Sequence, residues 1–261
     1  MSKKNAILII DAQYDFCNPN GALFVAGADA DMQRLNNFII RNKNQIDYIC
    51  VTLDTHPIHD ISHPSFWEDA QHQSPAPFTQ ITLAEVQSGK WKPKFFAKEA
   101  TEYLTKLEAQ GQFPHFIWPE HCLIGSKGAA IDEILMEALK IWAKDGKEYQ
   151  TVCKGTYPLS EHFGIFAAQI PVADRPETQL NTTLINTLQA YDHVYLAGQA
   201  KSHCVATSLK QAMDFAPTLA QKMIILEDTM SDVTGLGHLG QPIYQQAKQQ
   251  GIQFANSTLL I

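Results

Sequence analysis

The sequence predicts an α/β fold with three layers, in which helices cover both faces of a mainly parallel sheet of about six strands. Short apolar runs rich in β-branched residues alternate with amphipathic segments along the 261 residues, a pattern typical of such a sheet. Five of the apolar runs also end at reactive or metal-binding side chains, namely Asp11, the Asp54/His56 pair, His121, Lys154 and Cys204. Because parallel strands end at one edge of their sheet, these side chains are expected to meet in one crevice.

The apolar, β-branched runs predict strands at 5–10, 48–53, 115–117, 149–152, 193–197 and 222–226. Apolar residues at helical spacing predict helices at about 31–44, 98–110, 129–144, 181–190, 204–215 and 242–250.

A polar segment rich in histidine and proline covers residues 57–93 and interrupts this alternation. It is too long for a simple connection, so we expect a lid, an oligomer contact or a wall of a substrate pocket. We find no internal repeat, low-complexity tract or clear linker. The chain is therefore expected to form one domain over 1–261, with a long excursion at about 57–113.

Composition excludes several classes of function. The net charge of −7 argues against a nucleic-acid partner, and no run of about 20 apolar residues indicates a membrane segment. The apolar run near the N-terminus is too short for a signal peptide, so a cytoplasmic location is expected. An odd number of irregularly spaced cysteines then favours free thiols: Cys17, Cys50, Cys122, Cys153 and Cys204.

Cys204 is the cysteine whose position favours chemistry. It follows an apolar run and a glycine-containing turn, and it opens an amphipathic helix. Backbone N–H groups and the helix dipole at such a position lower the pKa of a thiol. The same amides can donate hydrogen bonds to the oxyanion that forms when a thiolate attacks a carbonyl. A buried structural cysteine is the alternative, and position alone does not decide between the two.

Asp11 and Lys154 each end a buried run. A partly buried carboxylate beside a thiol can take up its proton and later return it to a leaving amine. A helix N-cap or turn aspartate is the plainer reading of Asp11. An unpaired buried ammonium is costly, which makes Asp11 the candidate partner for Lys154. Otherwise Lys154 extends to the surface, as lone lysines commonly do.

Asp54 and His56 point to the same side of an extended segment because alternate residues do so. With His121 they provide a carboxylate and two imidazoles, a donor set that suits zinc first, with iron or manganese as alternatives. A further ligand is left open among His59, His63 and His72.

Residues 235–240 match the glycine spacing of a dinucleotide-binding loop. That loop requires a βαβ unit and an acidic residue about 20 positions further on. No acidic residue follows Gly240, so a turn is predicted there.

Ordered motifs along nearly the whole chain, IIDAQYDF, DTH, WPEHC, CKG and LAGQAKSHCV, resemble the isochorismatase-like cysteine hydrolase superfamily and its nicotinamidase/pyrazinamidase branch. The resemblance implies a Rossmann-like three-layer α/β/α sandwich. It implies Asp11 as the base, Lys154 as the cation and Cys204 as the nucleophile. It further implies that Ala200 and Cys204 form the oxyanion hole, with a cis peptide bond between Gln199 and Ala200.

The same resemblance implies that Asp54, His56 and His121 are metal ligands. Phe16 and Trp118 are similar to the aromatic walls that hold a pyridine ring in that branch, and aromatic rings can stack on a flat heterocycle.

The resemblance implies conversion of nicotinamide to nicotinate and ammonia through a thioester on Cys204. The branch usually has a Thr-Asp-Tyr type sequence where this chain has Lys201-Ser202-His203. The alternatives are therefore a hydrolase of another small amide or a carbamoyl or ureido compound, and, more remotely, a non-catalytic small-molecule-binding protein. Homo-oligomers are compatible with the resemblance.

Overall fold

The computed structural model describes residues 3–261 and contains a six-stranded, all-parallel sheet. The strand order is β5-β2-β1-β6-β7-β8, in which β1 and β6 lie side by side at the centre. This arrangement confirms the predicted α/β class. The strands are β1 (Asn5–Ile10), β2 (Ile46–Asp54), β5 (Gln150–Lys154), β6 (His193–Gly198), β7 (Met223–Leu226) and β8 (Gln253–Ala255).

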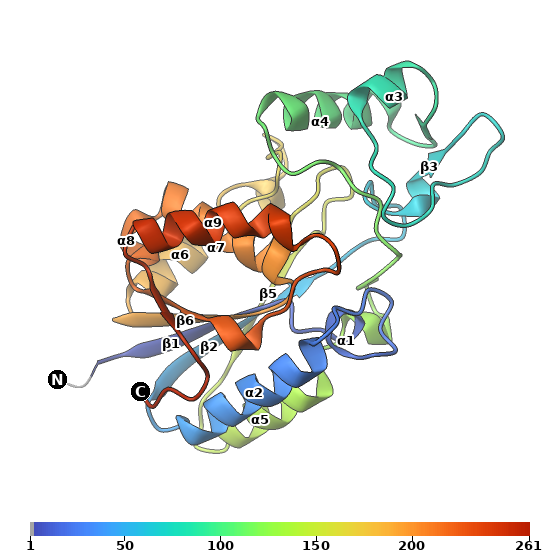
Figure 1. Cartoon of the computed structure of the whole chain (residues 1–261). Coiled ribbons are helices and arrows are strands. Elements are labelled where there is room, and N and C mark those ends of the chain that lie inside the picture. The colour runs from blue at the N-terminus through green and yellow to red at the C-terminus, as the bar shows by residue number, and fades with distance from the viewer. Residues whose placement is uncertain (1–2) are drawn as a thin grey trace.

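Helices cover both faces of the sheet (Figure 1). On one face α2 (Ala28–Arg41) packs along α5 (Glu133–Ala143). On the other face lie α6 (Thr182–Gln189), α7 (Ala206–Phe215), α8 (Pro217–Ala220) and α9 (Gly237–Gln249). Strands buried between two helical layers carry apolar side chains on both sides, and every residue of β1 is buried.

The excursion lies beside the end of β2, where its short helices and strands form a compact group (Figure 1). A second apolar cluster holds it together, with Phe66, Trp67, Leu104 and Leu107 buried among its members. Its elements are η1 (Pro64–Phe66), α3 (Leu83–Gln87), α4 (Ala97–Ala109) and the antiparallel pair β3 (Trp67–Glu68) and β4 (Lys92–Pro93).

The prediction of a strand at 115–117 was wrong. Phe116 forms only an isolated bridge with Gln80, and the segment lies outside the main sheet. The apolar character of this run reflects the burial of Ile117 in the second apolar cluster, which holds the excursion together. The short strand β8, which completes the sheet, was not predicted.

The helix predicted from residue 204 is preceded by a π-helical turn, η4 (Lys201–Val205). Helix α9 begins at Gly237, earlier than expected, and includes Pro242. A Cβ at Gly240 would lie 3.0 Å from the Ser202 Cα, so this glycine lets α9 pack closely on η4. The predicted turn therefore covers only the start of the glycine-rich segment.

The remaining short elements are α1 (Tyr14–Cys17), η2 (Lys127–Ala129), η3 (Pro176–Thr178) and η5 (Glu227–Thr229). Within residues 3–261, no helix has the length and apolar character needed to cross a membrane.

Candidate active site and metal centre

The central strands β1 and β6 place two candidate residues at one edge of the sheet. Asp11 follows β1, and Cys204 lies in η4 just after β6. Chain connections leave β1 and β6 in opposite directions along the sheet, which opens a crevice at their carboxyl ends. Gly198 ends β6 with φ +114°, and a Cβ there would lie 2.0 Å from the Ile10 carbonyl oxygen. Only glycine allows the two strand ends to lie this close.

A buried lysine joins the predicted acid and the predicted nucleophile. The Lys154 Nζ lies 2.9 Å from the Asp11 Oδ2, 2.9 Å from the Asp54 Oδ1 and 3.7 Å from the Cys204 Sγ. All four residues are buried. The Thr52 hydroxyl donates to the Asp11 Oδ1 at 2.5 Å and accepts from the Asp11 N–H at 2.9 Å. The side chains that the sequence placed at separate strand ends are therefore in contact.

The charges of this network are set by burial and by the neighbouring ions. Burial opposes the charge of Lys154, but the carboxylates of Asp11 and Asp54 outweigh it and raise the lysine pKa well above its usual value. Burial likewise opposes ionisation of Asp54, yet His56 and Lys154 bring its pKa well below the ordinary range. Lys154 is therefore charged, and Asp54 is a carboxylate.

Cys204 differs from the sequence expectation. Burial raises the pKa of its thiol well above the usual value and outweighs the opposing effect of Lys154, and Asp11 adds to the rise. Burial also raises the pKa of Asp11, against the attraction of Lys154. The thiol is thus protonated at rest, and a neighbouring carboxylate with raised proton affinity is positioned to accept its proton.

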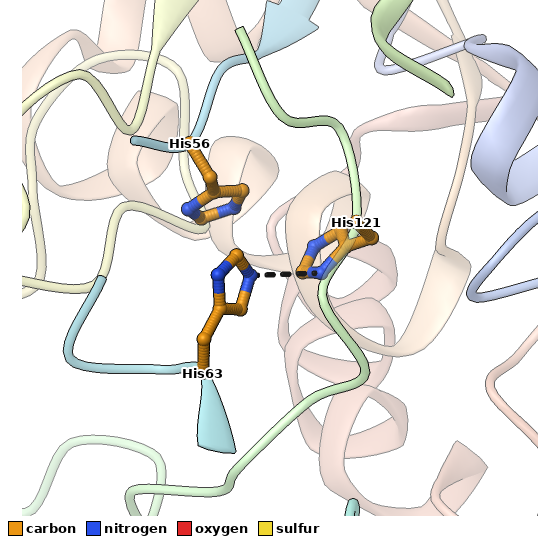
Figure 2. Close-up of side chains that lie close together, drawn as sticks. All are labelled: His56, His63 and His121. Atoms are coloured by element: carbon orange, nitrogen blue, oxygen red, sulfur yellow. Dashed lines mark hydrogen bonds between the residues drawn. The ribbon is translucent and has the colours of Figure 1, made fainter. Parts of the chain in front are cut away.

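Three buried histidines gather beside this network (Figure 2). Their candidate ligand atoms, one from each of His56, His63 and His121, lie within 4.8 Å of one another. The Asp54 Oδ2 is 3.0 Å from the His56 Nε2 and 3.5 Å from the His121 Nε2. Asp54 therefore contacts Lys154 through one oxygen and the histidine cluster through the other.

One ring nitrogen of each of two histidines is held by an acceptor. The His56 Nδ1 lies 2.9 Å from the Asp60 Oδ2, and the His121 Nδ1 lies 2.8 Å from the Pro119 carbonyl oxygen. Such contacts orient imidazoles whose other ring nitrogen binds a metal. Asp60 is in turn fixed by the Ser62 N–H and hydroxyl, at 2.9 and 2.7 Å.

Of the three histidines left open, His63 is the one in the cluster. His59 is exposed against Phe95, and His72 is exposed beside Glu68. Burial and the neighbouring His121 and His56 lower the pKa of His63 to about 3, so its imidazole is neutral and free to bind a metal.

A carboxylate with three buried imidazoles fits a divalent cation. The His63 Nδ1 is buried with no hydrogen-bond partner among the described residues, and nitrogen and oxygen donors suit zinc, iron or manganese. The cluster can therefore bind a metal.

A narrow pocket lies between the thiol and the histidines. Phe16, Trp118 and Ala200 line it together with Cys204 and His121. The Phe16 ring lies 5.3 Å from the His121 ring. The cavity volume of about 20 Å³ leaves room for about one water in this conformation, so a bound ring requires the lining side chains to shift.

The peptide bond between Gln199 and Ala200 is cis, as expected from the resemblance. The Ala200 N–H pairs with no backbone oxygen in the part of the chain that the structure describes. It is therefore available to a ligand at the pocket. The catalytic, oxyanion and substrate-binding roles of the site residues remain predictions.

Sequence reasoning missed the supports of this site. The Gln13 amide clamps Asp54, donating to its carbonyl oxygen at 2.8 Å and accepting from its N–H at 2.7 Å. Thr52 and Asp60 each lie on the chain beside a recognised residue, two before Asp54 and four after His56. For Thr52 the spacing is a signal that could have found it, since alternate strand residues share a face, whereas Asp60 lies outside a strand and the sequence carries no such signal for it.

Comparison with known proteins finds no matching family model and no curated protein of similar sequence. Solved structures do match. A nicotinamidase/pyrazinamidase of Acinetobacter baumannii superposes with a TM-score of 0.67 at 22% identity, covering 98% of this chain and 97% of that one. The chain has the fold of the nicotinamidases and pyrazinamidases.

Two further matches have the same nicotinamidase fold. The yeast nicotinamidase gives a TM-score of 0.67 at 19% identity, with 97% of this chain and 99% of that chain covered. The pyrazinamidase of Pyrococcus horikoshii, solved in complex with zinc, gives 0.57 at 18% identity over 97% and 99% of the two chains. The match spans the whole architecture and, at these identities, establishes the fold.

Proposed function

We propose that this protein is a metal-dependent amidohydrolase that cleaves a nicotinamide-like amide through a thioester on Cys204. The observation that carries the proposal is the position of the Lys154 Nζ, 2.9 Å from two buried carboxylates and 3.7 Å from the Cys204 Sγ. The thiol borders a pocket that Asp54 and His121 also line. The nicotinamidase fold supports the same reaction class.

Cys204 acts as the nucleophile, and Asp11 carries the proton. Asp11 takes the proton of Cys204, and the thiolate attacks the amide carbonyl carbon. The N–H groups of Ala200 and Cys204 stabilise the oxyanion, as preorganised donors do in other acyl transfers. Asp11 then protonates the departing ammonia, and Lys154 offsets the negative charge beside it. Water finally hydrolyses the thioester, which releases the carboxylate and restores the thiol.

Asp54, His56, His63 and His121 would hold the metal ion, zinc first with iron or manganese as alternatives. A bound ion would act as a Lewis acid towards a ring nitrogen of the substrate. Phe16 and Trp118 would stack on the substrate ring and fix the carbonyl beside Cys204.

Ammonia release from nicotinamide tests the proposal directly. The zinc-loaded protein is expected to release ammonia, and the Cys204→Ala variant is expected to lose turnover while retaining its circular dichroism spectrum, because only the nucleophile is removed. Carbamoyl and ureido compounds, with ammonia and carbon dioxide both detected, test the related substrate class. Unchanged ammonia release by Cys204→Ala would refute the assignment.

A further inference from the structure

Besides the Trp118 Nε1, two buried polar atoms on the wall of the substrate pocket have neither a hydrogen bond nor an ion pair among the described residues, namely the Glu161 Oε2 and the His203 Nε2. Glu161 is 5% exposed and His203 is 3% exposed. Both line the pocket that contains Cys204. Buried polar groups are nearly always paired in folded proteins, so two unpaired ones beside a reactive thiol point to a ligand.

His203 presents a donor to the pocket. The Val233 N–H donates to the Ser202 Oγ at 3.0 Å, and that oxygen lies 2.8 Å from the His203 Nδ1. The Nδ1 is the one acceptor found for the Ser202 hydroxyl among the described residues, so we assign that proton to the contact with Nδ1, which leaves the ring proton on the Nε2. Burial lowers the pKa of His203 to about 4, so the ring is neutral and carries this single N–H.

Aromatic rings hold His203 in place. Its ring lies 5.7 Å from Phe113, 5.1 Å from Trp118 and 5.4 Å from Phe163, each pair in an edge-to-face arrangement. Since this packing fixes the imidazole, the Nε2–H is a preorganised donor.

Glu161 adds a carboxyl group to the same pocket. Its Oε1 accepts from the His162 N–H at 3.1 Å, and its Oε2 is unpaired. Burial raises the pKa of Glu161 to about 7, with Asp60 and Asp54 adding to the rise. Near neutral pH the group can therefore accept or donate a hydrogen bond.

Nicotinamide has no atom left for these two groups. In the proposed reaction its ring nitrogen faces the metal, its carbonyl oxygen faces the amides of Ala200 and Cys204, and its amide nitrogen faces Asp11. Binding it would leave the Glu161 and His203 atoms buried and unpaired, which lowers affinity.

We propose that Glu161 and His203 select a heteroaromatic amide that carries an oxygen substituent, such as a ring hydroxyl, over the unsubstituted amide. A hydroxyl accepts from the His203 Nε2–H, and it or a neighbouring ring N–H donates to Glu161. This inference rests on the proposed amidohydrolase function. It gives a physical basis to the Lys201-Ser202-His203 sequence, which departs from the usual pattern of the branch that the chain resembles.

The test compares kcat/KM, from ammonia release by the zinc-loaded enzyme, for nicotinamide and for its monohydroxy derivatives at each free ring carbon. At least one hydroxylated amide is expected to exceed nicotinamide tenfold or more, because sites that bind a substrate hydroxyl strongly reject its deoxy analogue. His203→Phe keeps the ring packing and removes the donor, and Glu161→Met removes the carboxyl group. Each is expected to lower that preference at least tenfold.

His162→Phe is the matched control. His162 is also buried with an unpaired Nε2, but it does not line the pocket that holds Cys204. Its substitution is expected to leave the ratio of the two kcat/KM values unchanged. Titration calorimetry of the same amides with the zinc-loaded Cys204→Ala variant measures the preference in binding alone and should give the same order.

Two results would overturn the inference while leaving the amidohydrolase function in place. One is nicotinamide as the best substrate of the panel. The other is an equal effect of His203→Phe and Glu161→Met on all amides, which would indicate a structural role. Absence of ammonia from every amide would overturn both the inference and the proposed function.

Discussion

Lys154 is the residue that connects the two halves of the site. Its ammonium pairs with Asp11 on the side of the Cys204 thiol and with Asp54 on the side of the histidines. Because all of these groups are buried, each depends on the charge of its neighbours to remain favourable inside the protein. One side chain therefore affects folding, metal binding and the proposed reaction together.

Lys154→Met is expected to destabilise the protein by about 3–5 kcal/mol, because it leaves two buried carboxylates without their cation. Cys204→Ser is the comparison, since it alters the same network without removing a charge and should change stability far less. Urea unfolding of the two variants measures the difference. Equal stability of Lys154→Met and the wild type would show that the buried ion network contributes little.

Glu161 predicts a pH dependence of stability. Its pKa rises from the usual 4.5 to about 7 on folding. The folded state then binds the proton more tightly, so stability is full below pH 4.5, falls as pH rises towards 7 and levels off above it. The total is at most about 3 kcal/mol.

Glu161→Gln removes this titration while keeping the shape of the side chain. The unfolding free energy of the wild type minus that of Glu161→Gln should therefore decrease between pH 4.5 and pH 7 in urea titrations at fixed ionic strength. A difference that stays constant over this range would mean that Glu161 titrates normally in the folded protein.

At the scale of single elements, the turns after the strands position the site as much as the strands do. Gly155 directly follows β5 with φ +76°, and a Cβ on it would lie 2.8 Å from the Asp54 Oδ1. Gly146 has nearly the same backbone angle, φ +77°, with no atom within 4 Å of an added Cβ. Substitutions at these two glycines therefore distinguish the effect of backbone strain from the effect of contact with the site.

Gly155→Ala and Gly146→Ala are each expected to lower stability by about 1–2 kcal/mol, because alanine is strained at positive φ. Only Gly155→Ala is expected to displace the Asp54 carboxylate and weaken zinc binding. Zinc affinity by competition with a chromogenic chelator, together with thermal unfolding, distinguishes the two effects. Equal zinc affinities would show that Asp54 tolerates the added methyl group.

At the scale of the whole molecule, the excursion and the sheet share the metal cluster. His56 follows β2, whereas His63 and Asp60 come from the excursion and His121 follows it. The excursion also packs against two residues that line the pocket, since Phe78 contacts Trp118 and Phe113 contacts His203. A metal bound here would therefore tie the excursion to the sheet.

Chelation is expected to lower the melting temperature, and added zinc should restore it in proportion to the logarithm of its concentration. His63→Ala should abolish most of this zinc response. His59→Ala is the matched control, because His59 is an exposed histidine four residues away and outside the cluster. A zinc response that survives His63→Ala would place the metal elsewhere.

The sequence by itself determined the α/β class, the central strands and the chemical side chains at their ends. Strand β1 was predicted with the bounds observed, because buried parallel strands appear as uninterrupted apolar runs. The residues at 115–117 looked the same, yet they pack into the excursion. The apolar character of a segment indicates that the segment is buried, but it does not show which other part of the chain the segment packs against.

Tertiary structure alone decided which residues complete the site. It selected His63 over His59 and His72, joined Lys154 to both carboxylates, and buried Cys204 so that its thiol pKa rises where sequence reasoning expected a fall. It also brought Glu161 and His203 to one pocket. The physical reason is that burial and the distances between charges depend on chain segments far apart in sequence, and these quantities set both pKa and ligand geometry.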